Sequence, residues 1–322
     1  MSLTTRKPTG KPAWPMVLIA GTEKSGKSYA CAAASASDLI DRTFWIGIGE
    51  DDPDEYGGIP GARFEIVAHD GTYRDLLRAL DDINAELTTD GKPHMIVLDS
   101  ASRLWDLLKD EAQETAHRRA KVKAQKYQKQ APDVDEIKPS MDLWNLAAQR
   151  WGHVMDALRS HAGPVLLTAR LDEVAVMDAA GQPTREKEWK VSAHKSLPFD
   201  ASAVVELRGY RNALVRGVRS LRWRVPPDAL SPVKDFTVEA LWTLMGLTDA
   251  ADRSHHAVDA AASLDADAGT PKQRAWRLAV QVNKGDEEAA MADLTAYATA
   301  RDTTPAAATD NVWHDYLTGV PA

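Results

Sequence analysis

The sequence predicts an α/β fold, in which a mostly parallel central sheet is flanked by helices and is followed by a small C-terminal helical unit. Short, continuous apolar runs alternate with longer segments in which apolar residues recur every three or four positions, as expected for buried strands and one-sided helices. After residue 270 only the helical pattern continues. The third observation is a glycine-rich loop between the first strand and the first helix.

This loop, GTEKSGKS, occupies residues 21–28, between an apolar run at 16–20 and a helical segment. Two glycines let the backbone wrap a phosphate, so that amide N–H groups and the helix N-terminus point at the anion. In a loop of this pattern Lys27 reaches the β- and γ-phosphates, and the Ser28 hydroxyl binds Mg²⁺. The sequence therefore predicts an ATP·Mg²⁺ site. The expected nucleotide-binding residues are Gly21, Thr22, Glu23, Lys24, Ser25, Gly26, Lys27, Ser28 and Tyr29.

Two further strands are expected to end in carboxylates at the edge of the sheet that carries the loop. The run at 43–48 leads into Glu50, and the run at 95–98 is closed by Asp99. Ligands bind at the carboxyl ends of strands in open α/β sheets, so both acids would lie beside the phosphate loop. Asp99 is predicted to hold Mg²⁺ together with Ser28. Glu50 is either a functional carboxylate or part of a solvated acidic loop.

The later segments complete the sheet. A strand at 165–170 ends at the same edge, where Thr168 or Arg170 is a candidate for sensing the γ-phosphate. The charged segment 171–190 is expected to form an exposed hairpin or a mobile loop. Other strands are predicted at 62–67, 203–207 and 217–225, and other helices at 73–87, 141–158 and 236–247. The arginines of 208–224 form a basic sheet edge, which either binds a polyanion or prevents aggregation.

A helix of unusual length is predicted over 103–130, within a helical insertion at 103–140. Between residues 115 and 130 the sequence holds six Lys or Arg residues and no acid. At 100° per residue five of these share one face, whereas three alanines and Tyr127 fall on the opposite side. The face is either a solvated charged surface or an arm that binds single-stranded DNA through its phosphates. The DNA-binding candidates are Arg118, Arg119, Lys123, Lys126 and Lys129.

Charge, cysteine content and apolar content limit how the protein could contact nucleic acid and in which compartment it is expected. The net charge of −8 means that any contact with nucleic acid must come from a local basic patch. Cys31 is the single cysteine, so no internal disulfide can form, and a reducing cytoplasm is expected. No apolar segment approaches the ~20 residues that cross a bilayer. The predicted domains are a disordered leader (1–13), an α/β core (14–247), a linker (248–270) and a helical domain (271–322).

The order of these segments resembles a RecA-type P-loop ATPase over roughly residues 14–247. The run IGIGE, ending at Glu50, resembles the RecA strand that presents the water-activating glutamate, and VLDS, which contains Asp99, resembles its aspartate-serine strand. The tryptophan-bearing helix and the run VLLTAR at 165–170 are similar to phage-encoded RecA-like ATPases of single-strand annealing and recombination. The resemblance implies catalytic roles for Lys27, Glu50 and Thr168. It also implies that a cation completes the site of a neighbouring subunit, and Lys195 is the leading candidate for this finger, followed by Arg170 and Arg211.

The sequence departs from RecA in two places. RecA's strand ends in a glutamine, whereas the polar end of the strand at 165–170 is Thr168-Ala169-Arg170, and no N-terminal polymerisation domain is recognisable. A ring or a short oligomer is therefore an alternative to a filament.

Three functions agree with these patterns. The first is a Mg²⁺-dependent, DNA-stimulated ATPase that acts on single-stranded DNA in phage recombination or annealing, as a homo-oligomer in the host cytoplasm and with a single-strand-binding protein as a further partner. The second is a nucleotide-gated scaffold or loader in phage replication, with little hydrolysis. The third is a small-molecule phosphotransferase. The acids Glu50 and Asp99 favour hydrolysis over transfer, and the basic helix favours DNA over a metabolite.

Overall fold

The computed structural model describes residues 5, 7–88, 91–128, 132–209, 212–226, 229–247, 270–283 and 285–318. The chain divides into two compact units, Met1–His255 and His256–Ala322. The predicted linker at 248–270 lies outside the described residues except for Thr270, and the predicted leader at 1–13 is described only in part. Both of these domain boundaries therefore stay predictions.

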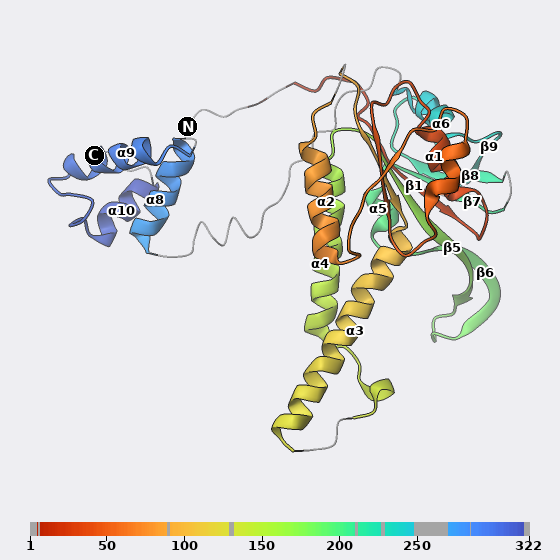
Figure 1. The fold of residues 1–322 in the computed structure, drawn as a ribbon, viewed down its shortest axis with the longest axis horizontal. Coiled ribbons are helices and arrows are strands. Elements are labelled where there is room, and N and C mark those ends of the chain that lie inside the picture. The colour runs from red at the N-terminus through yellow and green to blue at the C-terminus, as the bar shows by residue number, and fades with distance from the viewer. Residues whose placement is uncertain are drawn as a thin grey trace. The chain divides into compact units, whose positions relative to one another are not determined.

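The described residues of the first unit form one nine-stranded sheet, with the strand that precedes the phosphate loop in its interior (Figure 1). Its spatial order is β3-β2-β4-β5-β1-β7-β8-β9, and β6 pairs with β5. Neighbours from β3 to β7 in this order run parallel, whereas β6, β8 and β9 are antiparallel to their partners. The strands are β1 (Met16–Gly21), β2 (Thr43–Gly47), β3 (Glu65–Ile66), β4 (Met95–Asp99), β5 (Val165–Met177), β6 (Pro183–Ser192), β7 (Ala203–Leu207), β8 (Ala213–Val218) and β9 (Ser231–Val233).

Helices cover both faces of this sheet. Successive residues of β1 point to opposite faces: Leu18 packs in a core with residues of α2, α3 and α4, and Ile19 packs in a second core with residues of α1 and α6. The mostly parallel sheet, covered by helices on both faces, confirms the predicted α/β fold class. The helices are α1 (Lys27–Ala34), α2 (Tyr73–Ala85), α3 (Ala101–Lys126), α4 (Met141–Ser160), α5 (Leu197–Asp200) and α6 (Val238–Met245), with 3₁₀ turns η1 (Pro53–Gly58) and η2 (Val134–Glu136).

The long helix α3 begins where β4 ends. The Ser100 hydroxyl caps it by accepting the Arg103 N–H at 3.3 Å. The outer half of α3 extends away from the sheet (Figure 1) and packs against the start of α4 through a small cluster of Ala112, Ala116 and Leu143. The helix ends at Lys126, earlier than predicted, and residues 129–131 lie outside the described part.

Of the two predicted forms of the segment 171–190, a hairpin or a mobile loop, the structure has the hairpin. β5 continues beyond the buried part of the sheet and pairs with β6, beginning at the pair Arg170 and Ser192. The Asp178 carboxylate closes the turn by accepting the backbone N–H groups of Ala180 and Gln182, at 2.9 and 2.8 Å. The strand that carries Thr168 at the sheet edge therefore leads directly into an exposed hairpin.

The predicted strand at 217–225 is wrong. β8 ends at Val218, and its outer neighbour is β9. The Ser220 hydroxyl accepts the backbone N–H groups of Arg222 and Trp223, at 3.1 and 3.2 Å, and these bonds turn the chain instead of extending it.

The second unit contains α8 (Pro271–Val282), α9 (Glu287–Thr299) and α10 (Asp310–Thr318). A capping box starts α8, because Thr270 and Gln273 each accept the other's backbone N–H with their side chains. The core of this unit consists largely of alanines packed around Leu294 and Trp313. In the part of the chain that the structure describes, no helix combines the length and the apolar character that crossing a membrane requires.

Candidate active site

The phosphate loop is closed and anchored by its own backbone. Gly21 is required where the loop leaves β1, because a Cβ there would collide with Ser25 and with Leu207 of β7. Gly26 has φ 94°, a left-handed conformation that glycine adopts without strain. The Thr22 N–H donates to the Leu207 carbonyl at 3.1 Å, and Ser25 Oγ donates to the Thr22 carbonyl at 2.9 Å. The loop therefore presents the N-terminus of α1 in a preformed shape.

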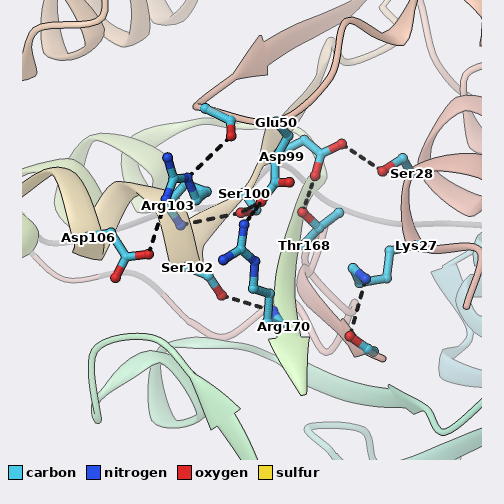
Figure 2. A network of polar contacts seen from close by, with 12 residues as sticks. Lys27, Ser28, Glu50, Asp99, Ser100, Ser102, Arg103, Asp106, Thr168 and Arg170 are labelled. Carbon is cyan, nitrogen blue, oxygen red and sulfur yellow. Dashed lines mark hydrogen bonds and ion pairs between the residues drawn. The ribbon is translucent and has the colours of Figure 1, made fainter. Parts of the chain in front are cut away.

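Lys27 folds back over this loop (Figure 2). Its Nζ donates to the carbonyl oxygens of Thr22 at 2.9 Å and of Gly21 at 3.2 Å. Burial lowers the pKa of Lys27, and the carboxylates of Asp99 and Glu50 act in the opposite direction. The ammonium thus rests on neutral acceptors, which a charged phosphate oxygen can replace with stronger hydrogen bonds.

Asp99, at the end of β4, is 5% exposed. Its Oδ2 accepts a hydrogen bond from Ser28 Oγ at 2.8 Å, and its Oδ1 accepts one from the Thr168 hydroxyl (Figure 2). Burial raises the pKa of Asp99, and the two hydroxyl bonds offset that effect only in part. The contact of Ser28 with Asp99 joins the two predicted metal ligands.

These two oxygen ligands fit Mg²⁺. This ion prefers hard oxygen ligands and usually combines one or two protein groups with water and phosphate oxygens. Within the described ranges no group of three or more His, Cys, Asp or Glu residues is placed to hold a metal ion. The pair therefore suits an ion that arrives with a nucleotide more than an ion held by protein alone.

Glu50 lies at the same edge, just after β2. Its Oε1 accepts both Ser100 Oγ, at 2.8 Å, and Arg170 Nη2, at 3.1 Å (Figure 2). Among the described residues no donor contacts Oε2. One oxygen thus fixes the carboxylate and the other is left to accept a proton, which is the arrangement that a general base needs.

Arg170 connects this carboxylate to the hairpin. Besides its bond to Glu50, its backbone N–H donates to Ser102 Oγ at 2.9 Å (Figure 2). Arg103 holds the neighbouring Gly49 through a bond from Nε to the carbonyl oxygen at 3.2 Å. Sequence reasoning named Ser100 only as part of the aspartate-serine strand and did not select Ser102 or Arg103, because polar residues at the start of a helix are ordinarily caps.

A hollow of about 710 Å³ opens beside the phosphate loop. It lies between α1, β7, β8 and the start of α6. Lys24, at its rim, has a left-handed φ of 53°, and its largely exposed ammonium lies 3.6 Å from the Glu23 carboxylate. The lining includes Gly26, Tyr29, Ala33, Leu207, Phe236 and Val238.

Lys195, the predicted finger, lies outside this network of contacts. Its side chain is exposed, whereas the preceding His194 packs against Trp105 and Trp151, with ring centroids 4.7 and 5.3 Å away. Burial lowers the pKa of His194. The described residues include no ion-pair partner for Lys195. The exposed Lys195 side chain therefore follows directly after a residue, His194, whose ring is held in place by packing. Its role in a neighbouring subunit stays a prediction. Of the other candidates for the finger, Arg211 lies outside the described residues.

The basic face of α3 differs from the prediction in two ways. Tyr127 is exposed and lines the same surface groove as Arg118, Arg119, Lys123 and Lys126, so its predicted position on the opposite side is wrong. The reason is that Tyr127 is the C-cap, with φ −100° and ψ 10°, so helical angles do not extend through it.

Acids outside the basic run also neutralise part of this face. The Arg119 guanidinium binds the Asp142 carboxylate at 2.6 Å, and Arg118 lies 3.9 Å from Glu114. Lys129 lies outside the described residues. Lys123 and Lys126 are therefore the strongest remaining candidates for phosphate contacts.

One buried acid neutralises part of the basic edge near β8 as well. Glu206 is 1% exposed and binds two guanidinium groups, Arg208 at 2.6 Å and Arg216. Arg208 also lies over the Trp189 ring, 5.3 Å from its centroid. A buried carboxylate thus uses these arginines as structural partners.

Comparison with known proteins finds no matching family model and no matching curated protein. Among solved structures, the crystal structure of the RadB recombinase aligns with a TM-score of 0.37 and 14% identity, over 70% of this chain and 93% of that one. A prototypical ATPase from the type III secretion system of pathogenic bacteria aligns with a TM-score of 0.35 and 13% identity, over 64% of this chain and 61% of that one.

Proposed function

We propose that this protein is an ATPase that binds ATP·Mg²⁺ at the phosphate loop and hydrolyses it. One observation carries the proposal: Lys27, Ser28, Asp99 and Glu50 come from three separate segments and meet at one edge of the sheet (Figure 2). Each has the chemistry that one part of the reaction requires. Lys27 binds phosphate, Ser28 and Asp99 would hold Mg²⁺, and Glu50 accepts a proton.

The chain's own groups divide the work as follows. Lys27 exchanges its bonds to the loop carbonyls for bonds to the β- and γ-phosphates. Glu50 takes the proton of the attacking water at Oε2, while Ser100 and Arg170 keep its orientation through Oε1. Mg²⁺, when bound, neutralises charge on the phosphate oxygens. Thr168 keeps Asp99 oriented toward Ser28.

The hollow beside α1 is a suitable site for the nucleoside. Its volume, about 710 Å³, lies in the range of small-molecule sites. The exposed Tyr29 ring and Phe236 offer apolar surface for a base, one turn of helix away from the phosphates. Phosphate and base subsites are thus continuous along α1.

Binding is tested by titrating the purified chain with a fluorescent ATP analogue in Mg²⁺. Lys27→Ala should abolish tight binding, because it removes the cation that faces the phosphates. Lys92→Ala is the control, since this exposed lysine precedes β4 and lies outside both the phosphate loop and the lining of the hollow. Equal affinity of the Lys27→Ala variant and the wild type would contradict the site.

We further infer that the substrate-side partner is single-stranded DNA and that the protein acts in phage recombination or annealing, as a homo-oligomer and alongside a single-strand-binding protein. The recombination role and the oligomer follow from the resemblance to RecA-like phage ATPases. DNA contact is supported by the groove on α3, where exposed lysines stand beside Tyr127. Aromatic rings next to backbone-binding cations are typical of sequence-tolerant single-strand binding.

Salt dependence tests the DNA contact. Each phosphate contact contributes about −0.7 to the slope of log K against log[salt] for single strands. The double variant Lys123→Gln, Lys126→Gln should therefore reduce the slope by about 1.4. Lys121→Gln, on the same helix but outside the groove lining, is the control. If the slope were unchanged in the double variant, the basic face of α3 would be a solvated charged surface that does not bind DNA.

A further inference from the structure

The second unit has a groove of about 660 Å³ between its three helices. One wall comes from α8 and the other from α9, α10 and the segment between them. The residues that line it are Lys272, Gln273, Trp276 and Arg277 on the first wall, and Met291, Leu294, Pro305 and Trp313 on the second.

The groove exists because the helices meet through small side chains. Four of the six buried core residues of this unit are alanines, which bring the helix backbones close at their contacts and leave the larger side chains at the margin. Met291 is 49% exposed, although it lies beside the buried Leu294 and Trp313. Five of the eight lining residues are apolar: Leu294 and Trp313 form the buried floor, whereas Met291 is exposed and Trp276 and Pro305 are half-buried.

The charge of the groove is opposite to that of the chain. The chain carries a net charge of −8, yet none of the described residues that line the groove is acidic. Lys272 and Arg277 flank Trp276 on the same wall. An apolar cleft with cations along one wall complements a ligand that carries a bulky apolar group next to carboxylates.

The geometry points to a docking site for an acidic peptide segment of a partner protein, with a large apolar side chain as its anchor. Trp276 and Met291 would contact the anchor, and Lys272 and Arg277 would pair with the flanking carboxylates. Met adapts its shape to different anchors, and Trp adds a rigid contact area. Among the described residues the buried indole N–H of Trp313 has no hydrogen-bond acceptor. A peptide carbonyl that reaches the groove floor could supply one.

Nucleic acid fits this groove less well. Base stacking needs an accessible aromatic face, but Trp313 is buried and Trp276 is half-buried. The cations lie on one wall only, and no track for a sugar-phosphate backbone continues beyond them among the residues that line the groove.

The test is fluorescence anisotropy with the full chain and a fluorescein-labelled peptide of about ten residues, in which Asp and Glu alternate with Leu and Phe. We expect saturable binding that weakens with salt. The double variant Lys272→Glu, Arg277→Glu should raise Kd at least about tenfold, because it places like charges opposite the carboxylates of the peptide. Gln281→Glu, an exposed position on α8 outside the groove, is the matched control and should change Kd less than about twofold.

Three results would overturn the proposal. One is no saturable peptide binding at millimolar concentration, and another is the same Kd for the double variant and the wild type. The third is binding of a labelled oligothymidine, lost in the double variant, without binding of the peptide. An unchanged far-UV circular dichroism spectrum and an unchanged emission maximum of tryptophan fluorescence would show that the unit of α8, α9 and α10, with its buried Trp313, is still folded in the double variant.

Discussion

Replacing Asp99 by Asn should stabilise the nucleotide-free protein at neutral pH, although it should also weaken the binding of ATP·Mg²⁺. Asp99 is almost fully buried, and burial raises its pKa despite bonds from Ser28 and Thr168. Because burial penalises the charged form of this carboxyl group, its ionisation costs more free energy in the folded protein than in the unfolded chain. Asn keeps the shape without the charge, and both hydroxyls can accept as well as donate. Relief of such a strained functional position is typically worth about 0.5–2 kcal/mol.

The sign of the pH dependence follows from the raised pKa. A carboxyl group whose pKa is higher in the folded state binds its proton more tightly there. It favours the fold at low pH and disfavours it as pH rises from the ordinary value of 3.8 through the folded-state pKa. The free energy of unfolding of Asp99→Asn, minus that of the wild type, should thus be positive at pH 7 and should shrink on acidification. Urea denaturation of the nucleotide-free protein at pH 7 and about pH 4.5 measures this difference.

Asp70→Asn is the matched control with the opposite sign. Hydrogen bonds from the hydroxyl and the backbone N–H of Thr72 lower the pKa of Asp70. Its replacement should therefore destabilise the protein at pH 7, with a loss that shrinks on acidification. If Asp99→Asn behaved like Asp70→Asn, the ionised Asp99 would stabilise the fold, and the argument from burial would be wrong.

Three other substitutions test neighbouring contacts. Arg170→Ala should lower kcat by about 10²-fold or more, because it removes a preorganised charge that orients Glu50. The free energy of unfolding should fall by less than about 1 kcal/mol, since the pair of Arg170 and Glu50 is partly exposed. An unchanged kcat would count against this role of Arg170. Thr168→Val should destabilise the protein by about 1–3 kcal/mol in urea denaturation at pH 7, because it leaves Asp99 Oδ1 without its donor; wild-type stability would refute this. Mixing inactive Lys195→Ala and Lys27→Ala proteins should restore part of the ATPase activity if Lys195 completes a neighbour's site. The absence of rescue at any ratio, with oligomers present, would exclude that role.

The fold and the phosphate loop were predictable because their signals are local. The collision that a Cβ at Gly21 would cause and the left-handed φ of Gly26 both follow from the loop pattern itself. The continuous apolar sequence of β1 reflects its two covered faces. In a strand that helices cover on both faces, every side chain faces apolar neighbours, so every side chain must itself be apolar.

The connections within the site were not predictable, since they join residues that are far apart in the sequence. Ser100 meets Glu50 across 50 positions, and Arg170 meets Glu50 across 120. Periodicity can place such residues at the same edge of the sheet, but it cannot choose which of them form hydrogen bonds.

The sequence also overestimated the basic surfaces. In the sequence Arg208 and Arg216 indicate an exposed positive edge, but in the structure both guanidinium groups bind the buried Glu206 carboxylate. Asp142 does the same for Arg119, from a different helix. A run of cations predicts a positive face only when no acid from elsewhere in the fold reaches it.

Single-turnover hydrolysis of ATP by Glu50→Gln, measured in Mg²⁺ beside the wild type, tests the central proposal most directly. Gln keeps an oxygen for Ser100 and Arg170 but cannot accept the proton of water, so ATP should still bind while hydrolysis falls by about 10²- to 10⁴-fold. Glu55→Gln, an exposed acid in the nearby η1 turn, should hydrolyse ATP at the wild-type rate. Equal rates for Glu50→Gln and the wild type would contradict the assignment of this site.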